Sequence, residues 1–162
     1  MAERVTVVGL GPGGLDAMAK PVRGALESAD LVVGGARHLA LVGSTRARRA
    51  LIEGDLAGVL DAIEAEPGHV CALASGDPGF FGILRALVAR LGRDRVDVHP
   101  APSSVALAFA RLGLPWDDAA VVSAHGRPLE DAARVAASLP KVAVLVAADS
   151  SPAALGAALL TL

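Results

Sequence analysis

The sequence contains no tyrosine, one tryptophan, three phenylalanines and a single cysteine among its 162 residues. Since one cysteine cannot form an internal disulfide, we expect a reducing, cytoplasmic setting in which Cys71 is a small core residue of an apolar strand. Scarce aromatic residues and a net charge of −2 argue against a nucleic-acid partner, which requires a basic face with rings for base stacking.

Long apolar runs and metal-ligand patterns are also missing. No run is long enough to span a membrane, and Met1–Arg4 leads directly into a strand pattern, so we expect no membrane partner and no signal peptide. Cysteine and histidine residues do not cluster with the spacing of metal ligands, so we expect no metal site. The hydrophobic share of 53% instead predicts a well-packed core.

Segments of strand and helix character alternate along the chain, which predicts an α/β fold with a largely parallel sheet and flanking helices. The predicted strands cover residues 4–9, 30–34, 50–52, 69–74, 95–99, 119–123 and 141–146. The predicted helices cover residues 15–28, 36–41, 55–65, 80–91, 103–112, 128–138 and 151–160, with Asp55 as an N-cap. The break at residues 113–118 predicts two small α/β domains, an N-terminal one over 1–114 and a partial C-terminal one over 119–162.

A glycine-rich turn follows the first predicted strand, in the order Gly9-Leu10-Gly11-Pro12-Gly13-Gly14. Glycine has no Cβ, so such a turn lets a nucleotide-like ligand approach the backbone amides. Three of these glycines match the dinucleotide pattern G-x-G-x-x-G, but the acid that should end the second strand is absent: Glu27 and Asp30 both precede that strand. An NAD site is therefore disfavoured, whereas a plain strand-to-helix connection stays open.

Three further loops of small and polar residues follow predicted strands, at residues 75–82, 100–104 and 123–128. Ligands of parallel sheets bind beyond the carboxyl ends of the strands. Four such loops are harder to explain as plain turns than one, so we expect a binding site where they meet.

Together these loops resemble the tetrapyrrole methylase family, the class III S-adenosylmethionine-dependent methyltransferases. The turn GLGPGG is similar to that family's proline-containing glycine loop, and ASGDPGFFG at residues 74–82 is similar to its G-D-P-x-x-Y-G signature, with Phe81 in place of tyrosine. Pro102-Ser103-Ser104 falls where the family has a P-G-[IV]-[ST]-[SA] turn, without the glycine. GGARHL at 34–39 and SAHGRP at 123–128 are similar to the branch that methylates precorrin-6 in cobalamin biosynthesis.

The resemblance implies a dimeric enzyme that uses S-adenosylmethionine to methylate a precorrin-6 or cobalt-precorrin tetrapyrrole at the C-5 meso carbon. The cofactor-binding residues that it implies are Gly11, Pro12, Gly76, Asp77, Phe80, Ser104, Val105 and Ala147. Family members continue past a helix like that at 151–160 with further strands, so we expect the second domain to be incomplete in this sequence. Methyl transfer from a sulfonium mainly needs alignment, and no catalytic residue stands out.

The substrate candidates are His125, Arg127 and Arg37, because a precorrin carries many carboxylates and arginine binds carboxylates through two donors. Plainer interpretations stay open. Asp77 could be a turn-former whose carboxylate caps the helix predicted at 80–91, His125 could be a turn histidine bonded to local backbone, and Arg37 could begin a solvated helix. The alternative for the whole chain is a non-catalytic nucleotide- or cofactor-binding module that uses the same loops.

Overall fold

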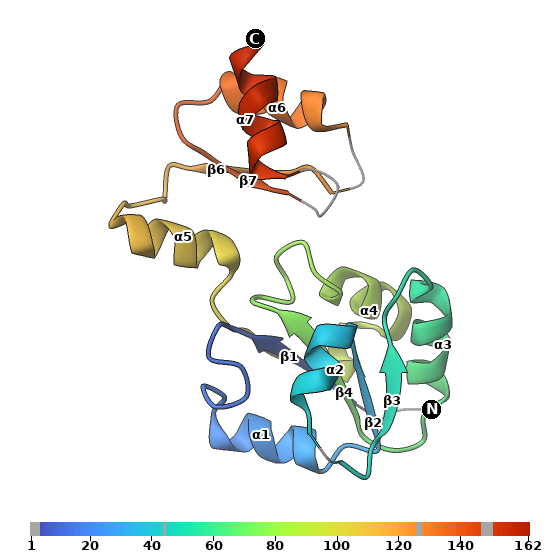
Figure 1. Ribbon diagram of the computed structural model, residues 1–162. Coiled ribbons are helices and arrows are strands. Elements are labelled where there is room, and N and C mark those ends of the chain that lie inside the picture. The colour runs from blue at the N-terminus through green and yellow to red at the C-terminus, as the bar shows by residue number, and fades with distance from the viewer. Residues whose placement is uncertain (1–3, 44, 126–127, 147–150) are drawn as a thin grey trace. The chain divides into compact units, whose positions relative to one another are not determined.

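The computed structural model describes residues 4–43, 45–125, 128–146 and 151–162 (Figure 1). Contacts divide the chain into two compact units, Met1–Ser103 and Ser104–Leu162. Strands alternate with helices in both units, so the predicted α/β class is confirmed. These contacts group the helix at 104–112 with the second unit, and the domain boundary at residues 114–119 stays a prediction.

The first unit is built on a sheet of five parallel strands in the order β3-β2-β4-β1-β5. The strands are β1 (Val5–Leu10), β2 (Leu31–Gly34), β3 (Arg48–Leu51), β4 (Val70–Ser75) and β5 (Val96–His99). β1 lies between β4 and β5, so that Val5 pairs with both Val70 and Val96. An inner strand that is covered on both faces is mostly apolar, which explains the buried residues Val5, Val7 and Val8. Thr6 is the buried polar exception, and its hydroxyl lies 2.9 Å from the His69 Nε2.

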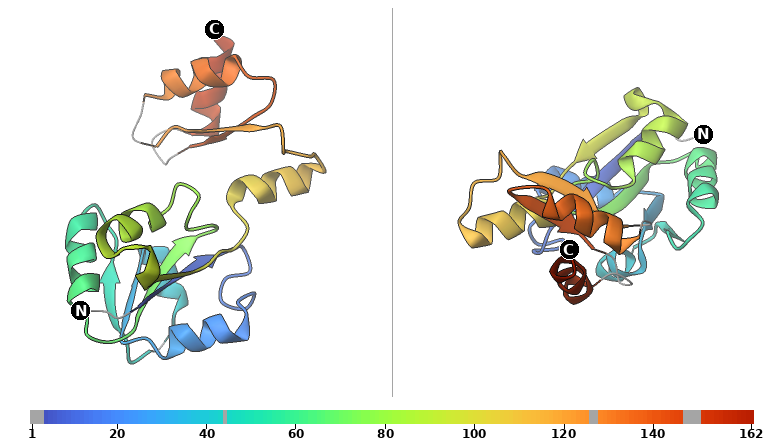
Figure 2. Two further views of the ribbon diagram at one scale, coloured as in Figure 1. Left: turned by 180° about the vertical axis from the view of Figure 1, so that it is seen from behind. Right: turned by 90° about the horizontal axis from the view of Figure 1, so that it is seen from above.

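Helices cover both faces of this sheet (Figures 1 and 2). They are α1 (Lys20–Glu27), α2 (Ala36–Leu41), α3 (Leu56–Ala65) and α4 (Leu84–Leu91), and a short 3-10 turn η1 (Arg93–Arg95) precedes β5. Successive side chains of β1 point to opposite faces of the sheet, and each face has its own hydrophobic core. Val7 packs in one core with Ile63 and Leu87 of α3 and α4, whereas Val8 packs in the other with residues of α1 and α2.

Two local predictions are confirmed in the first unit. The Asp55 side chain accepts a hydrogen bond from the Gly58 backbone N–H at 2.9 Å and so caps α3. Cys71 is fully buried in β4, and burial raises the pKa of its thiol to about 12. It is therefore a packing residue of the core and not a nucleophile.

Two predicted helix starts are wrong. α1 begins at Lys20 and not at residue 15, because a turn closed by a hydrogen bond from Gly14 N–H to Gly11 O follows β1, and Pro21 sets the first turn of the helix. α4 begins at Leu84 and not at residue 80, because Phe81 adopts a left-handed backbone with φ of 56° that no helix continues. Both glycine-rich segments are longer loops than their patterns indicated.

The second unit contains α5 (Ser104–Leu112), β6 (Ala120–Ser123), α6 (Leu129–Ala137), β7 (Val142–Leu145) and α7 (Pro152–Leu160). β6 and β7 form a two-stranded parallel sheet in which Ala120 pairs with Val142. The helix between them buries small residues, Ala132, Ala133 and Ala136. In the same unit the rings of Phe109 and Trp116 stack with centroids 5.9 Å apart.

Candidate functional site

Three of the predicted loops meet at the carboxyl edge of the five-stranded sheet through their main chains. The Gly76 N–H donates to Leu10 O at 2.8 Å, which joins the loop after β4 to the end of β1. The Ala101 N–H in turn donates to Gly76 O at 3.2 Å, which adds the loop after β5. This edge is where parallel sheets place their ligands.

Two glycines make this crossing of main chains sterically feasible. A Cβ on Gly9 would lie 1.9 Å from Gly76 O and 2.6 Å from Ala101 N, distances that real side chains do not reach. Gly76 has a left-handed φ of +58°, and a Cβ there would lie 3.0 Å from the Ser103 Cα. Packing of the loops against one another therefore accounts for both glycines.

Gly11 differs from these two glycines. A Cβ on Gly11 would meet nothing closer than the Ala101 Cβ at 3.6 Å, an ordinary van der Waals distance, and its φ lies outside the left-handed region. The protein itself thus has room for a side chain at this position. The contacts within the protein therefore do not account for the glycine at position 11.

The loop after β4 is folded around Asp77. Its carboxylate Oδ1 accepts the Gly79 N–H at 2.8 Å, and its carbonyl accepts the Phe80 N–H at 3.0 Å. α4 starts later, at Leu84, and has no side-chain cap. Asp77 is therefore a turn-former, as predicted, because its carboxylate closes an Asx turn within the loop, but the expectation that it caps the following helix is wrong.

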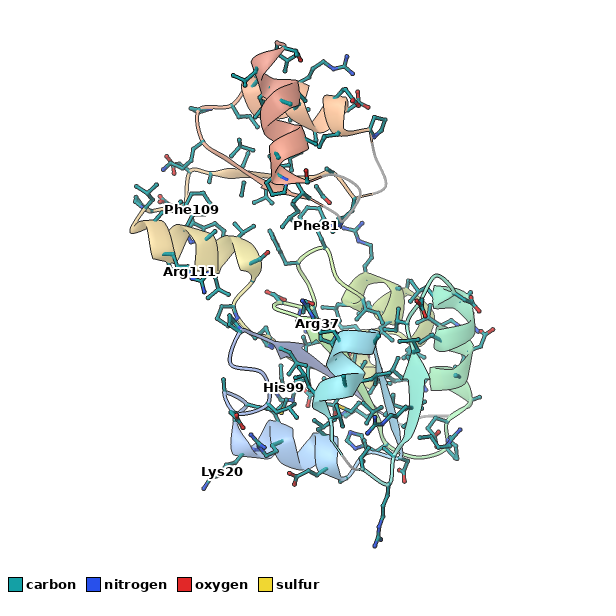
Figure 3. The ribbon with its side chains drawn as sticks, viewed as in Figure 1. Lys20, Arg37, Phe81, His99, Phe109 and Arg111 are labelled. Carbon is teal, nitrogen blue, oxygen red and sulfur yellow. The ribbon has the colours of Figure 1, made fainter. Side chains whose placement is uncertain are left out.

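Phe81 on the same loop carries backbone strain. Its left-handed φ of 56° is unfavourable for a phenylalanine, and its side chain is nevertheless 58% exposed, in edge-to-face contact with Phe80 at 5.1 Å (Figure 3). A Cβ on the next residue, Gly82, would lie 2.5 Å from Pro78 O, so the chain is tightly folded here. Strain that presents an apolar ring to solvent is typical of binding sites, and the sequence pattern alone did not reveal it.

Arg37, a predicted substrate residue, lies at this same edge. Its Nη2 donates to the Ser75 Oγ at 2.9 Å, and the His38 Nε2 lies 3.0 Å from that oxygen. β2 and β4 are neighbours in the sheet, which brings α2 beside the end of β4, and Ser75 directly precedes Gly76. Burial, and secondly the charge of Arg37, lower the pKa of His38 below its usual value. Sequence reasoning missed Ser75, although its position as the last residue of a buried strand was a usable signal.

The remaining predicted residues lie in the second unit. The His125 N–H donates to Ser123 Oγ at 3.3 Å, and its ring Nε2 lies 3.1 Å from Val146 O, so the imidazole is bonded to local backbone at the ends of β6 and β7. Ser104 and Val105 form the first turn of α5, where Val105 is buried. Arg127 and Ala147 lie outside the described residues.

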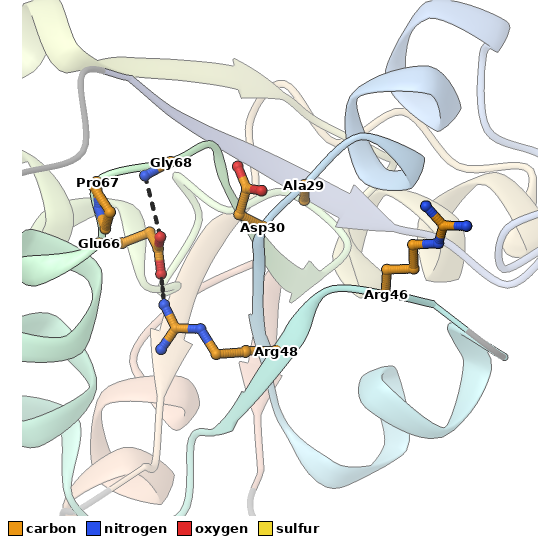
Figure 4. Close-up of a pocket in the computed structure, with 7 residues that line it drawn as sticks. All are labelled: Ala29, Asp30, Arg46, Arg48, Glu66, Pro67 and Gly68. Atoms are coloured by element: carbon orange, nitrogen blue, oxygen red, sulfur yellow. Dashed lines mark hydrogen bonds and ion pairs between the residues drawn. The ribbon is translucent and has the colours of Figure 1, made fainter.

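A depression of about 520 Å³ lies at the opposite, amino edge of the sheet (Figure 4). It is lined by Ala29, Asp30, Arg46, Arg48, Glu66, Pro67 and Gly68. Its carboxylates are already engaged: Glu66 pairs with Arg48 and accepts the Gly68 N–H, and Asp30 accepts the His69 N–H at 2.8 Å. These contacts fasten strand ends together, so we place the functional site at the carboxyl edge.

Among the described residues, no group of three or more histidine, cysteine, aspartate or glutamate residues is arranged to hold a metal ion. No helix in the described part of the chain is both long enough and apolar enough to cross a bilayer.

Sequence comparison identifies relatives along most of the chain. Those that are 37% identical to it include a precorrin-6Y C(5,15)-methyltransferase (decarboxylating) of Sinorhizobium over 134 residues and a cobalt-precorrin-7 C(5)-methyltransferase of Salmonella typhimurium over 124 residues. These alignments cover 78% and 76% of this chain but 31% and 62% of the respective relatives. The chain therefore spans less than two thirds of either relative.

Solved structures of similar fold include two proteins that are likewise named as methyltransferases or methylases. The methyltransferase CobJ matches with a TM-score of 0.66 and 27% identity, over 83% of this chain and 64% of its own. The precorrin-6Y methylase of Archaeoglobus fulgidus matches with a TM-score of 0.60 and 25% identity, over 77% and 66% of the two chains. Residues 4–161 match the sequence family of Tetrapyrrole (Corrin/Porphyrin) Methylases. The chain therefore belongs to the tetrapyrrole methylases, the family that its loops resemble.

Proposed function

We propose that this chain binds S-adenosylmethionine at the carboxyl edge of its five-stranded sheet and methylates a precorrin-6 or cobalt-precorrin tetrapyrrole at C-5, in cobalamin biosynthesis. Two relatives with 37% identity have names that specify this type of C(5) methylation. The structural observation that carries the proposal is the crossing of three loops beside Gly11, whose missing side chain the protein's own packing does not require.

The residues at this edge fit the cofactor. Gly11 itself adds no side chain at this edge, and the Asp77 carboxylate closes a turn within the neighbouring loop. The residues that would hold the cofactor are Gly11, Pro12, Gly76, Asp77 and Phe80 in the first unit, with Ser104, Val105 and Ala147 from the second. When bound, S-adenosylmethionine supplies a methyl group on a positively charged sulfur.

The side chains of this chain bind and orient the substrate. Arg37, His125 and Arg127 are the proposed contacts for the carboxylates of the tetrapyrrole, because guanidinium groups pair with carboxylates through directed hydrogen bonds. The position of Arg37 supports this role, because its guanidinium donates a hydrogen bond to Ser75, and Ser75 directly precedes Gly76 of the proposed cofactor loop. Alignment of the ring carbon with the methyl donor supplies much of the catalysis, and we assign no residue as a catalytic base.

We further propose that the protein works as a cytoplasmic homodimer, the state that the family resemblance implies. Light scattering coupled to size-exclusion chromatography measures this directly. A mass of twice 16.2 kDa is expected for the chain. A monomer at micromolar concentration would contradict the dimer.

Calorimetric titration of the chain with S-adenosylhomocysteine tests the proposed cofactor site. We expect micromolar binding that NAD and ATP do not reproduce and that Asp77→Arg abolishes, because the substitution removes the acceptor of the Gly79 N–H and adds bulk to the loop. Binding of NAD or ATP in place of S-adenosylhomocysteine would support the non-catalytic module instead. The methyltransferase names of the relatives do not favour that alternative.

A further inference from the structure

We propose that Arg37 and Ser75 form a two-donor site for one carboxylate of the tetrapyrrole, and that His38 is a positioning residue that directs the Ser75 hydroxyl toward this ligand. The inference rests on the proposed function and adds to it a hydroxyl donor and a mechanism for orienting it. All three residues belong to the first unit, where α2 follows β2 (Figure 1) and Ser75 ends the neighbouring strand β4. Figure 3 shows the Arg37 side chain.

The hydrogen bonds around Ser75 determine where its proton points. Arg37 can only donate, and its Nη2 lies 2.9 Å from Ser75 Oγ. The His38 Nε2 lies 3.0 Å from the same oxygen, and either atom of this second pair can be the donor. The tautomer of His38 therefore decides whether the Ser75 hydroxyl proton is donated to the His38 ring or is left for a ligand.

The surroundings of the other ring nitrogen favour one tautomer. The His38 Nδ1 is buried and has no hydrogen-bond partner among the described residues. A proton on Nδ1 would be a buried donor without an acceptor, which native structures rarely contain, whereas an unpaired acceptor is tolerated more often. The proton therefore sits on Nε2 and is donated to Ser75 Oγ. The lowered pKa of His38 agrees with a neutral ring that holds one proton.

With both Arg37 and His38 donating to it, the Ser75 oxygen has used its two lone pairs. Its own proton is then left for an acceptor outside this cluster. Within the described part of the chain, Arg37 forms no ion pair with a carboxylate, so its positive charge is uncompensated. An exposed guanidinium beside a free hydroxyl proton fits a carboxylate, which accepts from both donors.

Two parts of the proposed reaction mixture carry carboxylates: the tetrapyrrole and the amino-acid end of the cofactor. The cofactor's carboxylate is attached to the same carbon as an ammonium group, which the charge of Arg37 would repel. The side chains of a tetrapyrrole acid carry carboxylates without a neighbouring cation. We therefore assign the Arg37–Ser75 site to the tetrapyrrole.

The test uses two corrin probes with the same ring, cobyrinic acid with carboxylate side chains and cobinamide with amide side chains. Loss of one hydrogen bond to a charged group at an exposed site predicts that Ser75→Ala and Arg37→Gln each weaken cobyrinic acid binding by about tenfold, with cobinamide binding unchanged. His38→Gln, which places a donor near the former Nε2, should retain most of the affinity, whereas the shorter His38→Asn should not. Arg46→Gln is the matched control, because Arg46 is an exposed arginine at the amino edge of the same sheet.

Each outcome decides the inference. Wild-type affinity for cobyrinic acid in both Ser75→Ala and Arg37→Gln, with S-adenosylhomocysteine still bound, would overturn the carboxylate site and leave the proposed function intact. Loss of S-adenosylhomocysteine binding in Arg37→Gln, with cobyrinic acid binding unchanged, would assign the carboxylate to the cofactor and also overturn it. A wild-type chain that binds neither S-adenosylhomocysteine nor cobyrinic acid would contradict the proposed function itself. Thermal unfolding confirms that each variant is folded, and the exposed Arg37 side chain makes Arg37→Gln the safest of them.

Discussion

Gly9 and Gly11 lie two residues apart, yet we expect alanine at Gly9 to destabilise the fold and alanine at Gly11 to leave stability nearly unchanged while weakening ligand binding. A Cβ at Gly9 would lie 1.9 Å from Gly76 O and 2.6 Å from Ala101 N, so the main chains of three loops must separate. That movement would break the hydrogen bonds from Gly76 N–H to Leu10 O and from Ala101 N–H to Gly76 O. At Gly11 the same Cβ would meet only the Ala101 Cβ at 3.6 Å.

The magnitudes follow from these contacts. Overpacking costs about 1–3 kcal/mol and each of the two lost backbone hydrogen bonds about 0.5–1.5 kcal/mol, so Gly9→Ala should lower the free energy of unfolding by roughly 2–6 kcal/mol. For a chain of 162 residues, at about 2–4 °C per kcal/mol, that corresponds to a fall in Tm of roughly 4–24 °C. Gly11→Ala should change the free energy of unfolding by less than about 1 kcal/mol, because the residue becomes less flexible in the unfolded chain and meets no clash in the folded one.

Ligand binding separates the two glycines further. The added methyl group at Gly11 occupies the space in which we place the cofactor, so Gly11→Ala should weaken S-adenosylhomocysteine binding by at least about tenfold, or 1.4 kcal/mol. Urea unfolding and calorimetric titration of both variants measure the two effects. A Gly9→Ala protein as stable as wild type would refute the steric argument. A Gly11→Ala protein that is stable and binds S-adenosylhomocysteine normally would refute the location of the site.

Three further predictions concern single side chains. Phe81→Asn should maintain or raise the free energy of unfolding, because asparagine tolerates the left-handed backbone at φ 56°, and should weaken corrin binding if the exposed ring contacts the substrate; urea unfolding and corrin titration test both parts. The pKa of His38 lies below the usual 6.5 in the folded protein, so the unfolded chain binds the proton more readily and the free energy of unfolding falls as pH drops through 6.5. Between pH 7.5 and pH 5.5 the free energy of unfolding should fall less in His38→Gln than in wild type, and an equal fall would contradict this cause. Cys71 should not react with a thiol reagent until the protein unfolds, because burial raises the pKa of its thiol to about 12; fast labelling of the native protein would be inconsistent with its burial.

The strands and their parallel arrangement could be predicted because inner strands such as β1 are mostly apolar, with Val5, Val7 and Val8 buried, and this pattern is local. The N-cap at Asp55 was equally local, since a carboxylate three residues before a free backbone N–H is a short-range signal. The starts of α1 and α4 were predicted less accurately than the strands. The glycine-rich turn and the left-handed Phe81 extend both loops beyond the points at which apolar periodicity resumes.

In the candidate site too, some features could be predicted from local sequence and others could not. Its loops were recognisable from their sequences, and Arg37 could be singled out as an arginine in one of the motifs that follow predicted strands. The steric requirement for glycine at position 9 could not be recognised from the sequence. It arises from close contacts with Gly76 and Ala101, which the fold brings near from distant parts of the chain. The role proposed for Ser75 likewise depends on neighbours from another strand.

The most direct test of the central claim is methyl transfer itself. The purified chain should be incubated with S-adenosylmethionine carrying a ¹³C-labelled methyl group and with cobalt-precorrin-7, and the tetrapyrrole should then be analysed by mass spectrometry and NMR. We predict a product that is one methyl group heavier and carries the label at C-5, formed more slowly by Arg37→Gln. An unmethylated tetrapyrrole, recovered from a folded chain that binds S-adenosylhomocysteine, would contradict the assignment of this activity to the chain.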